Sequence, residues 1–185
     1  MKPYLLGIDI GTSACKVAVF EKSGTVVAAA NGDYPVYYPK EGWAEQNPEE
    51  WWNAVCQAVK KAIQKAGIAP EEIAGIGIDG QSWSAIAMDK DGNVLTNTPI
   101  WMDTRAQSIC DRLNEEIGAE QIFEVSGNSL QPSYTTAKIL WYKENLPEVY
   151  QRIHKILQSN SYIAYKLTGV MIQDVSQAMA CIALT

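Results

Sequence analysis

An acidic residue at the end of an apolar strand is the first feature of this chain that could do chemistry. Residues 6–17 read Leu-Gly-Ile-Asp-Ile-Gly-Thr-Ser-Ala-Cys-Lys-Val, and Asp9 carries their only acidic group. Because side chains alternate along a strand, Asp9 should project from one face while its apolar neighbours share the other. These neighbours are Leu6, Ile8 and Ile10. The carboxylate is therefore predicted to stand clear of the core that anchors its strand.

A Gly-Thr-Ser turn follows Asp9 and suits the phosphate tail of a nucleotide. Gly11 has no side chain to obstruct a phosphate, and Thr12 and Ser13 add hydroxyl and backbone N–H donors around an anion. Asp9 can hold the hydrated Mg²⁺ that offsets the phosphate charge, so we take it as the catalytic and metal-binding residue, and we assign Lys16 to the cofactor-binding residues. The same residue types also dominate ordinary hairpin turns, so the motif alone leaves both interpretations open.

Two other nucleotide-binding motifs fit this turn poorly. A Walker loop requires Gly-Lys followed by Ser or Thr at the start of a helix, whereas Lys16 follows Cys15 inside an expected strand. A dinucleotide fingerprint requires three glycines that open a helix, and the residues after Gly11 are expected to form a strand. We therefore assign the turn to neither class.

The composition predicts a globular, acidic protein without a nucleic-acid partner. The chain has 185 residues, of which 47% are hydrophobic, enough for one sizeable core. Its formal net charge is -6, and no run of lysine or arginine forms a basic patch for a phosphate backbone. No apolar run approaches the roughly 20 residues that span a bilayer, so no membrane partner is expected either.

The cysteines, the histidine and the first residues favour a cytoplasmic protein without a metal cluster. Cys15, Cys56, Cys110 and Cys181 lack the paired spacing of a zinc site or a redox couple, so we expect reduced, mostly packed thiols. The first strand is expected almost at the N-terminus, which leaves no room for a signal peptide. The single histidine, His154, has polar neighbours that predict an exposed helix face rather than a catalytic or zinc-binding position.

The first third of the chain is predicted to form a meander, a loop and a helix. Three short strands are expected, at 4–10, 15–20 and 25–30. A loop rich in proline, glycine and tyrosine covers 31–47, and the helix should begin at Asn47-Pro48 and end at Gly67. Its buried stripe is predicted at Trp51, Val55, Val59 and Ile63.

The remainder is predicted to alternate strand and helix before it becomes mainly helical, which makes the fold class α/β. Strands are expected at 73–78, 85–88, 98–101 and 170–175. Helices are expected at 104–117, 119–125, 135–145, 147–157 and 160–167.

Two segments combine an aromatic wall with hydrogen-bonding groups, as a polyol pocket requires. Residues 80–84, Gly-Gln-Ser-Trp-Ser, follow a buried strand, and residues 101–105, Trp-Met-Asp-Thr-Arg, precede a helix. Each also has an explanation without a ligand, since Trp83 and Trp101 would serve as core aromatics and Asp103 as a helix cap. The residues alone leave both interpretations open.

In their order along the chain, these motifs resemble the FGGY family of carbohydrate kinases over essentially the whole sequence. The matching segments are Gly7–Ser13, Gly42–Pro48 before Trp51-Trp52, Gly77–Gln81, Trp101–Arg105, Thr135–Asn145 and Asn160–Gly169. The resemblance implies an actin-like ATPase (ribonuclease H-like) domain. We therefore expect a mixed sheet with an antiparallel N-terminal meander and flanking helices.

Within the family the chain looks most similar to xylulokinases, which implies phosphorylation of a ketopentose such as D-xylulose with ATP and Mg²⁺. By that resemblance Asp9 would position the metal, and the Gly-Thr-Ser turn would lie against the nucleotide phosphates. The residues that would face the sugar are Gln81, Ser82, Trp83 and Asp103. Xylulokinases commonly carry Met-His where this chain has Ser82-Trp83, so a sugar-contacting imidazole is missing. Ribulose, gluconate or another polyol stays open as the substrate, as does a nucleotide-binding module of the actin or chaperone class.

Family members are longer, and only their first domain is matched. We interpret residues 1–185 as the N-terminal domain of a sugar kinase without its C-terminal domain, because the stretch 177–185 stops within an apolar run. The aspartate that activates the sugar hydroxyl and the adenosine-binding loops would lie in the missing half, and a positioned general base is worth about 10²- to 10⁴-fold in rate. The chain alone is therefore expected to lack kinase activity. It is also expected to associate with a second copy, because this would bury the surface that otherwise packs against the missing domain.

Overall fold

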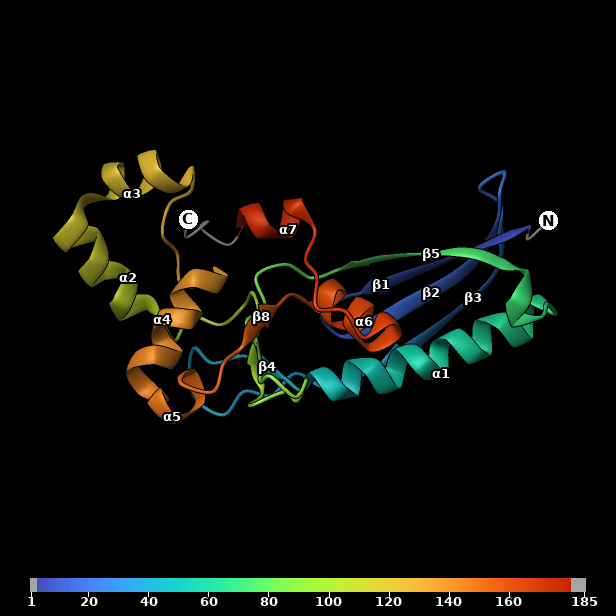
Figure 1. Cartoon of the computed structure of the whole chain (residues 1–185), viewed down its shortest axis with the longest axis horizontal. Coiled ribbons are helices and arrows are strands. Elements are labelled where there is room, and N and C mark those ends of the chain that lie inside the picture. Colours follow the sequence, from blue (N-terminus) through green and yellow to red (C-terminus); the bar gives the residue numbers. More distant parts are fainter. Residues whose placement is uncertain (1–2, 181–185) are drawn as a thin grey trace. The chain divides into compact units, whose positions relative to one another are not determined.

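The computed structural model describes residues 3–180, which divide into two compact units. The first unit comprises the chain up to Val36 together with Glu49–Gln81. The second comprises Tyr37–Pro48 and the chain from Ser82 onward. Figure 1 labels the elements of both units.

The first unit is a four-stranded mixed sheet with a long helix on one face (Figure 1). The strands are β1 (Tyr4–Ile10), β2 (Ala14–Glu21), β3 (Val26–Asp33) and β5 (Ile73–Gly80), in the order β3-β2-β1-β5. The hairpin pairs β1–β2 and β2–β3 are antiparallel, whereas β5 runs parallel to β1. The predicted meander and mixed sheet are confirmed.

Helix α1 (Pro48–Ala66) and the short helix η1 (Pro70–Glu72) connect the meander to β5. The apolar residues of β1 alternate as predicted, with Leu6 and Ile8 3% exposed and Ile10 0% exposed. The buried residues of α1 are Trp51, Ala54, Val55, Ala58 and Ala62. Val59 and Ile63, predicted in this stripe, are only half-buried. The stripe consists mainly of small residues because α1 approaches β3 closely: a Cβ on Gly32 would lie 2.8 Å from the Ala54 carbonyl oxygen.

The second unit combines two short β-ribbons with several helices. One ribbon pairs β4 (Glu45–Gln46) with β7 (Thr98–Pro99), and the other pairs β6 (Ile86–Met88) with β8 (Lys155–Leu157). The helices are α2 (Gln107–Leu113), η2 (Asn114–Gly118), α3 (Ala119–Ser126), α4 (Thr135–Asn145), α5 (Pro147–Tyr150), α6 (Ser159–Thr168) and α7 (Val175–Ala180). Their core includes Ala85, Ala87, Cys110, Ala137, Trp141 and Tyr142.

Two predicted elements of the second unit are wrong. The helix predicted over 147–157 ends at Tyr150, and its last three residues form β8 instead, because they pair with β6. The strand predicted over 170–175 does not form, and Asp174 begins a helix by accepting a hydrogen bond of 2.9 Å from the Gln177 backbone N–H. The helix predicted over 104–117 is shortened to α2 and continues as the π-helical η2.

The expectations on thiols, metal clusters and membrane spans can be checked over residues 3–180. Cys15, Cys56 and Cys110 are free thiols, whereas Cys181 and the end of the apolar stretch 177–185 lie outside the described residues. His154 is exposed, as predicted, but lies in a bend just before β8 rather than on a helix. Within the described part of the chain, no helix has the length and apolar character to cross a bilayer, and no group of three or more metal-ligating side chains occurs.

Candidate functional site

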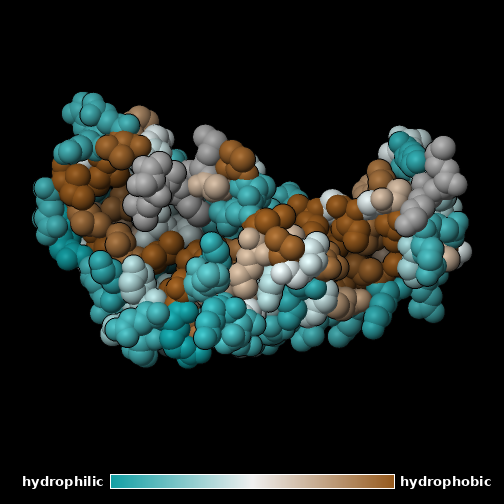
Figure 2. Space-filling view, viewed as in Figure 1, coloured by the Kyte–Doolittle hydropathy of each residue, from teal (hydrophilic) through white to brown (hydrophobic). Residues whose placement is uncertain are grey.

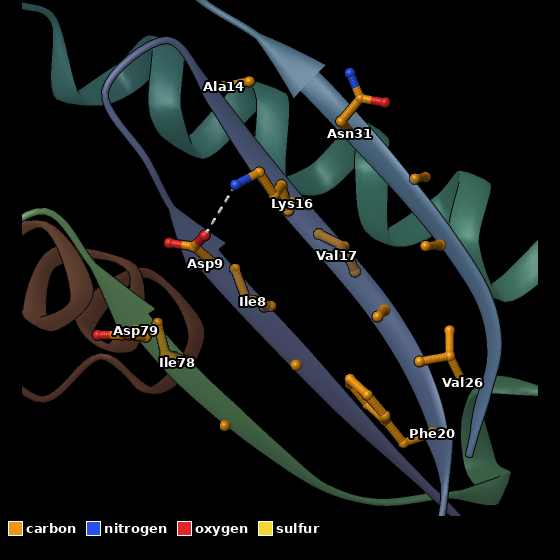
Figure 3. Close-up of a pocket in the computed structure, with 15 residues that line it drawn as sticks. Ile8, Asp9, Ala14, Lys16, Val17, Phe20, Val26, Asn31, Ile78 and Asp79 are labelled. Atoms are coloured by element: carbon orange, nitrogen blue, oxygen red, sulfur yellow. Dashed lines mark ion pairs between the residues drawn. The ribbon is translucent and has the colours of Figure 1, made fainter. Parts of the chain in front are cut away.

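The face of the sheet turned away from α1 is open and carries a hollow (Figure 3). Strands β1, β2, β3 and β5 all contribute to its lining, and its volume is about 960 Å³. Leu5 and Val26 are 41% and 55% exposed, and Figure 2 shows hydrophobic residues gathered where the strands run. Such an exposed apolar surface is unusual on a free domain and is typical of a binding face.

A row of four polar side chains crosses this open face. In the strand register Asp9 pairs with Lys16 and with Asp79, and Lys16 pairs with Asn31. All four line the hollow, and Figure 3 shows Asp9 and Asp79 on neighbouring strands. The sheet therefore presents two adjacent carboxylates, an ammonium and an amide at one level.

Asp9 is accessible, as the sequence predicts. Its side chain is 47% exposed, and its carboxylate lies 3.7 Å from the Lys16 ammonium, whose side chain is 75% exposed (Figure 3). An ion pair this exposed contributes little to stability, so either partner can exchange the other for a ligand of opposite charge. The arrangement fits a cation at Asp9 and an anion at Lys16.

The oxygen donors of this row suit Mg²⁺. This ion prefers oxygen ligands, and proteins usually hold it through one or two carboxylates together with substrate phosphates and water. Asp9 and the neighbouring Asp79 offer that number of carboxylates at the edge of the turn. These two carboxylates therefore provide enough ligands for Mg²⁺ only together with a phosphate.

The turn between β1 and β2 is held by Tyr34, a residue that was not among the predicted site residues. The Gly11 N–H donates to the Ala14 carbonyl oxygen at 3.1 Å, and the Tyr34 hydroxyl donates to the Gly11 carbonyl oxygen at 2.6 Å. A Cβ at position 11 would lie 3.0 Å from the Ala14 carbonyl oxygen, so glycine keeps this turn tight. Burial, followed by the charges of Cys15 and Asp9, raises the pKa of Tyr34 far above its ordinary value, so Tyr34 remains a donor.

Of the other residues predicted to bind the cofactor, Thr12 is half-buried and Ser13 is exposed in the same turn. Gln81, predicted to face the sugar, adjoins this turn. Its backbone N–H donates to the Ile10 carbonyl oxygen at 2.8 Å, and its side-chain amide donates to the Gly11 carbonyl oxygen at 3.5 Å. The structure therefore brings Gln81 together with the predicted phosphate-binding residues.

Ser82 and Trp83 belong to the second unit and are both half-buried. The Ser82 hydroxyl accepts a hydrogen bond of 3.1 Å from the side-chain amide of Gln177 in α7. Trp83 has a φ of 64°, which makes it the one non-glycine residue with positive φ among residues 3–180. Its ring centre lies 4.9 Å from that of Tyr134. Both side chains keep exposed surface, as ligand-contacting residues require.

Asp103 differs from its prediction as a sugar-facing residue, because its side chain is fully buried. One carboxylate oxygen accepts the Ala44 backbone N–H at 2.7 Å and Arg105 Nη2 at 2.8 Å. The other accepts Nε and the backbone N–H of Arg105, at 2.9 and 3.0 Å. These four donors occupy the acceptor positions of the carboxylate, so Asp103 stabilises the protein structure instead of facing a ligand. It is not the N-cap of α2 either, since Ala106 holds that position.

Arg105 completes this buried cluster. Its guanidinium is 3% exposed, donates to Glu45 at 2.7 Å and stacks 3.8 Å from the centre of the Trp43 ring. Burial alone would lower the pKa of Arg105, but hydrogen bonds and charge from Asp103 and Glu45 outweigh it and raise the pKa. The segment 101–105 is therefore fixed by a permanent ion pair, while Trp101 remains 42% exposed.

Comparison with known proteins identifies the chain's relatives. Residues 4–184 match the FGGY family of carbohydrate kinases, N-terminal domain. The xylulose kinase of Bacillus subtilis is 32% identical over 181 residues, and the glycerol kinase of Thermococcus gammatolerans is 30% identical over 182 residues. These alignments cover 98% and 96% of this chain but only 36% and 37% of the relatives. The crystal structure of a gluconate kinase from Lactobacillus acidophilus superposes with a TM-score of 0.91 at 31% identity, covering 98% of this chain and 36% of that one.

Proposed function

Because the chain belongs to the FGGY family of carbohydrate kinases, we propose that it is the N-terminal domain of an enzyme that phosphorylates a sugar hydroxyl with ATP. The observation that carries this proposal is Asp9, an accessible carboxylate at the end of β1 beside a tight Gly-Thr-Ser turn. The chain spans about a third of its relatives, so the catalytic base and the adenosine-binding residues are assigned to a part that follows it.

Phosphoryl transfer depends mainly on positioning and on electrostatic stabilisation, and this chain offers groups for both. Asp9 would hold Mg²⁺, which neutralises phosphate charge when bound. Gly11 would leave room for the phosphates to approach, and Thr12 and Ser13 would present backbone and hydroxyl donors to them. Lys16 would turn from Asp9 towards a phosphate oxygen, because its exposed ion pair holds it only weakly.

Gln81, Ser82 and Trp83 are proposed to bind the sugar. Together they offer an amide, a hydroxyl and an aromatic surface, which suits a molecule with alternating hydroxyl and C–H groups. Asp103 is left out of this set because its carboxylate is buried and filled.

D-xylulose is our proposed substrate, supported by the similarity to xylulose kinases. Glycerol and gluconate are the alternatives, since a glycerol kinase and a gluconate kinase are similar to nearly the same degree. Turnover of the longer enzyme on these three compounds would decide among them, because pockets that hydrogen-bond a hydroxyl discriminate strongly against compounds without it.

Titration of the chain with ATP in the presence and absence of Mg²⁺ tests the nucleotide site. Asp9→Asn should remove most of the gain in affinity that Mg²⁺ gives. Glu21→Gln is the matched control, because it also removes one exposed carboxylate from β1–β2 but lies opposite Tyr4, at the other end of β1. Equal Mg²⁺-dependent affinity in Asp9→Asn and in the unchanged chain would refute the role of Asp9.

An assay of ADP release with D-xylulose tests the proposal that the general base lies outside this chain. Residues 1–185 alone should show no sugar-dependent ADP release, because the general base is proposed to lie elsewhere. Turnover near that of a full-length relative would overturn this part of the proposal.

A further inference from the structure

Three consecutive carbonyl groups, those of residues 83, 84 and 85, accept hydrogen bonds from side chains of α4. Lys138 Nζ donates to the Trp83 oxygen at 2.6 Å, Thr135 Oγ1 donates to the Ser84 oxygen at 3.2 Å, and the Tyr142 hydroxyl donates to the Ala85 oxygen at 2.9 Å. The three donors are spaced by three and four residues, so they share one face of the helix. We refer to Thr135, Lys138 and Tyr142 as the α4 clamp.

Lys138 is the centre of this clamp. It is 0% exposed, and its Nζ also donates to the carbonyl oxygens of Ile100 at 2.7 Å and Ser133 at 2.6 Å. Three acceptors require three N–H donors, which only the protonated ammonium provides. Burying a charge is unfavourable unless hydrogen bonds compensate for it, and an apolar side chain would fill the space without that penalty. An apolar side chain could not, however, join the three segments whose carbonyl groups the ammonium holds.

Among the residues that the α4 clamp holds, Trp83 has the most unusual backbone conformation. Its φ of 64° lies in the left-handed region, which a bulky residue rarely adopts. Such conformations persist only where the surroundings over-determine them. Here the carbonyl group is held by Lys138, and the indole packs on Tyr134, the residue that precedes α4. Both constraints on Trp83 come from α4 and the residue directly before it.

We propose that Lys138 is a positioning residue that fixes the left-handed backbone of Trp83 and thereby aims the indole and the adjacent Ser82 at the sugar. The same ammonium holds the carbonyl group of Ile100, which directly precedes Trp101, so the segments 82–85 and 100–105 are tied to one atom. The part of the proposal that concerns the sugar rests on the proposed function. The part that concerns the backbone of Trp83 stands independently of it.

The test replaces Lys138 by Met, which matches the lysine side chain as far as Cε and removes the ammonium. Lys143→Met is the matched control, because Lys143 is an exposed residue of the same helix. The near-ultraviolet circular dichroism of a Trp83→Phe variant first defines the signal that Trp83 contributes through its contact with Tyr134. Lys138→Met should lose most of that signal, and Lys143→Met should keep it. Full retention in Lys138→Met would overturn the proposal.

Calorimetric titration with D-xylulose, glycerol and gluconate then measures the consequence for binding. Lys138→Met should weaken binding of the preferred compound at least tenfold, while ATP affinity should change less than twofold, because the phosphate turn lies outside the clamp. Loss of the Trp83 signal with unchanged sugar affinity would overturn the link to the sugar. If the unchanged chain binds none of the three compounds, the proposed sugar-binding role of Ser82 and Trp83 fails, and the dichroism alone decides the role of Lys138.

A second measurement covers the case in which Lys138→Met does not fold. Hydrogen exchange of the unchanged chain should protect the backbone amides of 84–86 as strongly as those of α4. Ser84, Ala85 and Ile86 are 0% exposed, so their N–H groups reach water only when the clamped segment separates from the helix. Exchange at the rate of an exposed loop would overturn the proposal without any substitution.

Discussion

Replacing Arg105 by Met should remove a large part of the stability of the second unit. The substitution deletes a guanidinium that is 3% exposed and makes three hydrogen bonds of 2.7 to 2.9 Å with the carboxylates of Asp103 and Glu45. Breaking a buried ion pair by removing one partner typically destabilises a protein by about 3–5 kcal/mol, because the other charge stays buried. Loss of the stack on Trp43 adds about 0.5–2 kcal/mol. Domains of this size are stable by about 5–15 kcal/mol, so the expected loss is a substantial fraction.

Urea denaturation followed by tryptophan fluorescence measures this effect. With a slope of about 2 kcal/mol per molar urea, a loss of about 4 kcal/mol lowers the midpoint by about 2 M. Arg112→Met is the control, because it breaks an ion pair with Glu144 that is exposed to solvent and should hardly move the midpoint. Adding Asp103→Asn to Arg105→Met should restore part of the loss, since it removes the unpaired charge. If Arg105→Met and Arg112→Met have the same midpoint, the buried cluster does not stabilise the unit as argued.

Three further predictions concern single groups. Tyr34→Phe removes the donor to the Gly11 carbonyl oxygen, so it should lower the unfolding free energy by about 1 kcal/mol in urea and weaken Mg-ATP binding several-fold; no change in either would contradict the role of Tyr34. Hydrogen bonds from the backbone and then the side chain of Asn93 lower the pKa of Asp89, so the stability they provide is complete above about pH 4 and is lost as the pH falls through the lowered pKa. Asn93→Ala removes only the side-chain bonds, so it should flatten this acid limb of the stability curve in part, and an unchanged limb would argue against their share of the linkage. Burial raises the pKa of Cys110 to about 11, so its contribution to stability is complete below about pH 8.5 and is lost towards pH 11. Mass spectrometry after iodoacetamide treatment of the folded chain at pH 8 should find Cys110 unmodified.

The features that the sequence predicts correctly depend on contacts between near neighbours. Alternation along 4–10 gives the buried and open faces of β1, and the Asn47-Pro48 signal gives the start of α1 to within a residue. Asp9 follows from the same alternation, because one polar residue among alternating apolar ones must point away from the core. The turn, the meander and the accessible carboxylate were therefore within reach of sequence patterns.

The errors arise where a distant segment decides the outcome. Residues 155–157 have no strong strand pattern, yet they pair with β6, some 70 positions earlier in the chain. Asp103 has the sequence setting of a ligand-binding or capping residue, and only the approach of the Ala44 N–H and Glu45 shows that its carboxylate is filled. Tyr34 likewise gives no local sign that its hydroxyl reaches Gly11.

The helical spacing around Lys138 is a sequence pattern that indicates its burial. It stands four residues before Tyr142 and three after Thr135, on the helix face that the apolar periodicity would bury, and an unaccompanied lysine on such a face needs acceptors from elsewhere in the chain. The pattern predicts burial of an ammonium, but it cannot tell which carbonyl groups surround it.

The charged groups of this chain divide by how completely their hydrogen-bonding capacity is used. Asp103 and Lys138 are 0% exposed, and hydrogen bonds occupy four acceptor positions of Asp103 and three donors of Lys138, so no capacity is left for a ligand. Asp9 and Lys16 have one long, exposed contact with each other, and their remaining capacity faces the hollow. A ligand can compete with the second kind of pair but not with the first, because displacing a buried, filled charge would leave its partners unsatisfied. Substitutions of the filled charges should therefore act first on stability and geometry, whereas substitutions of the open pair should act first on ligand affinity.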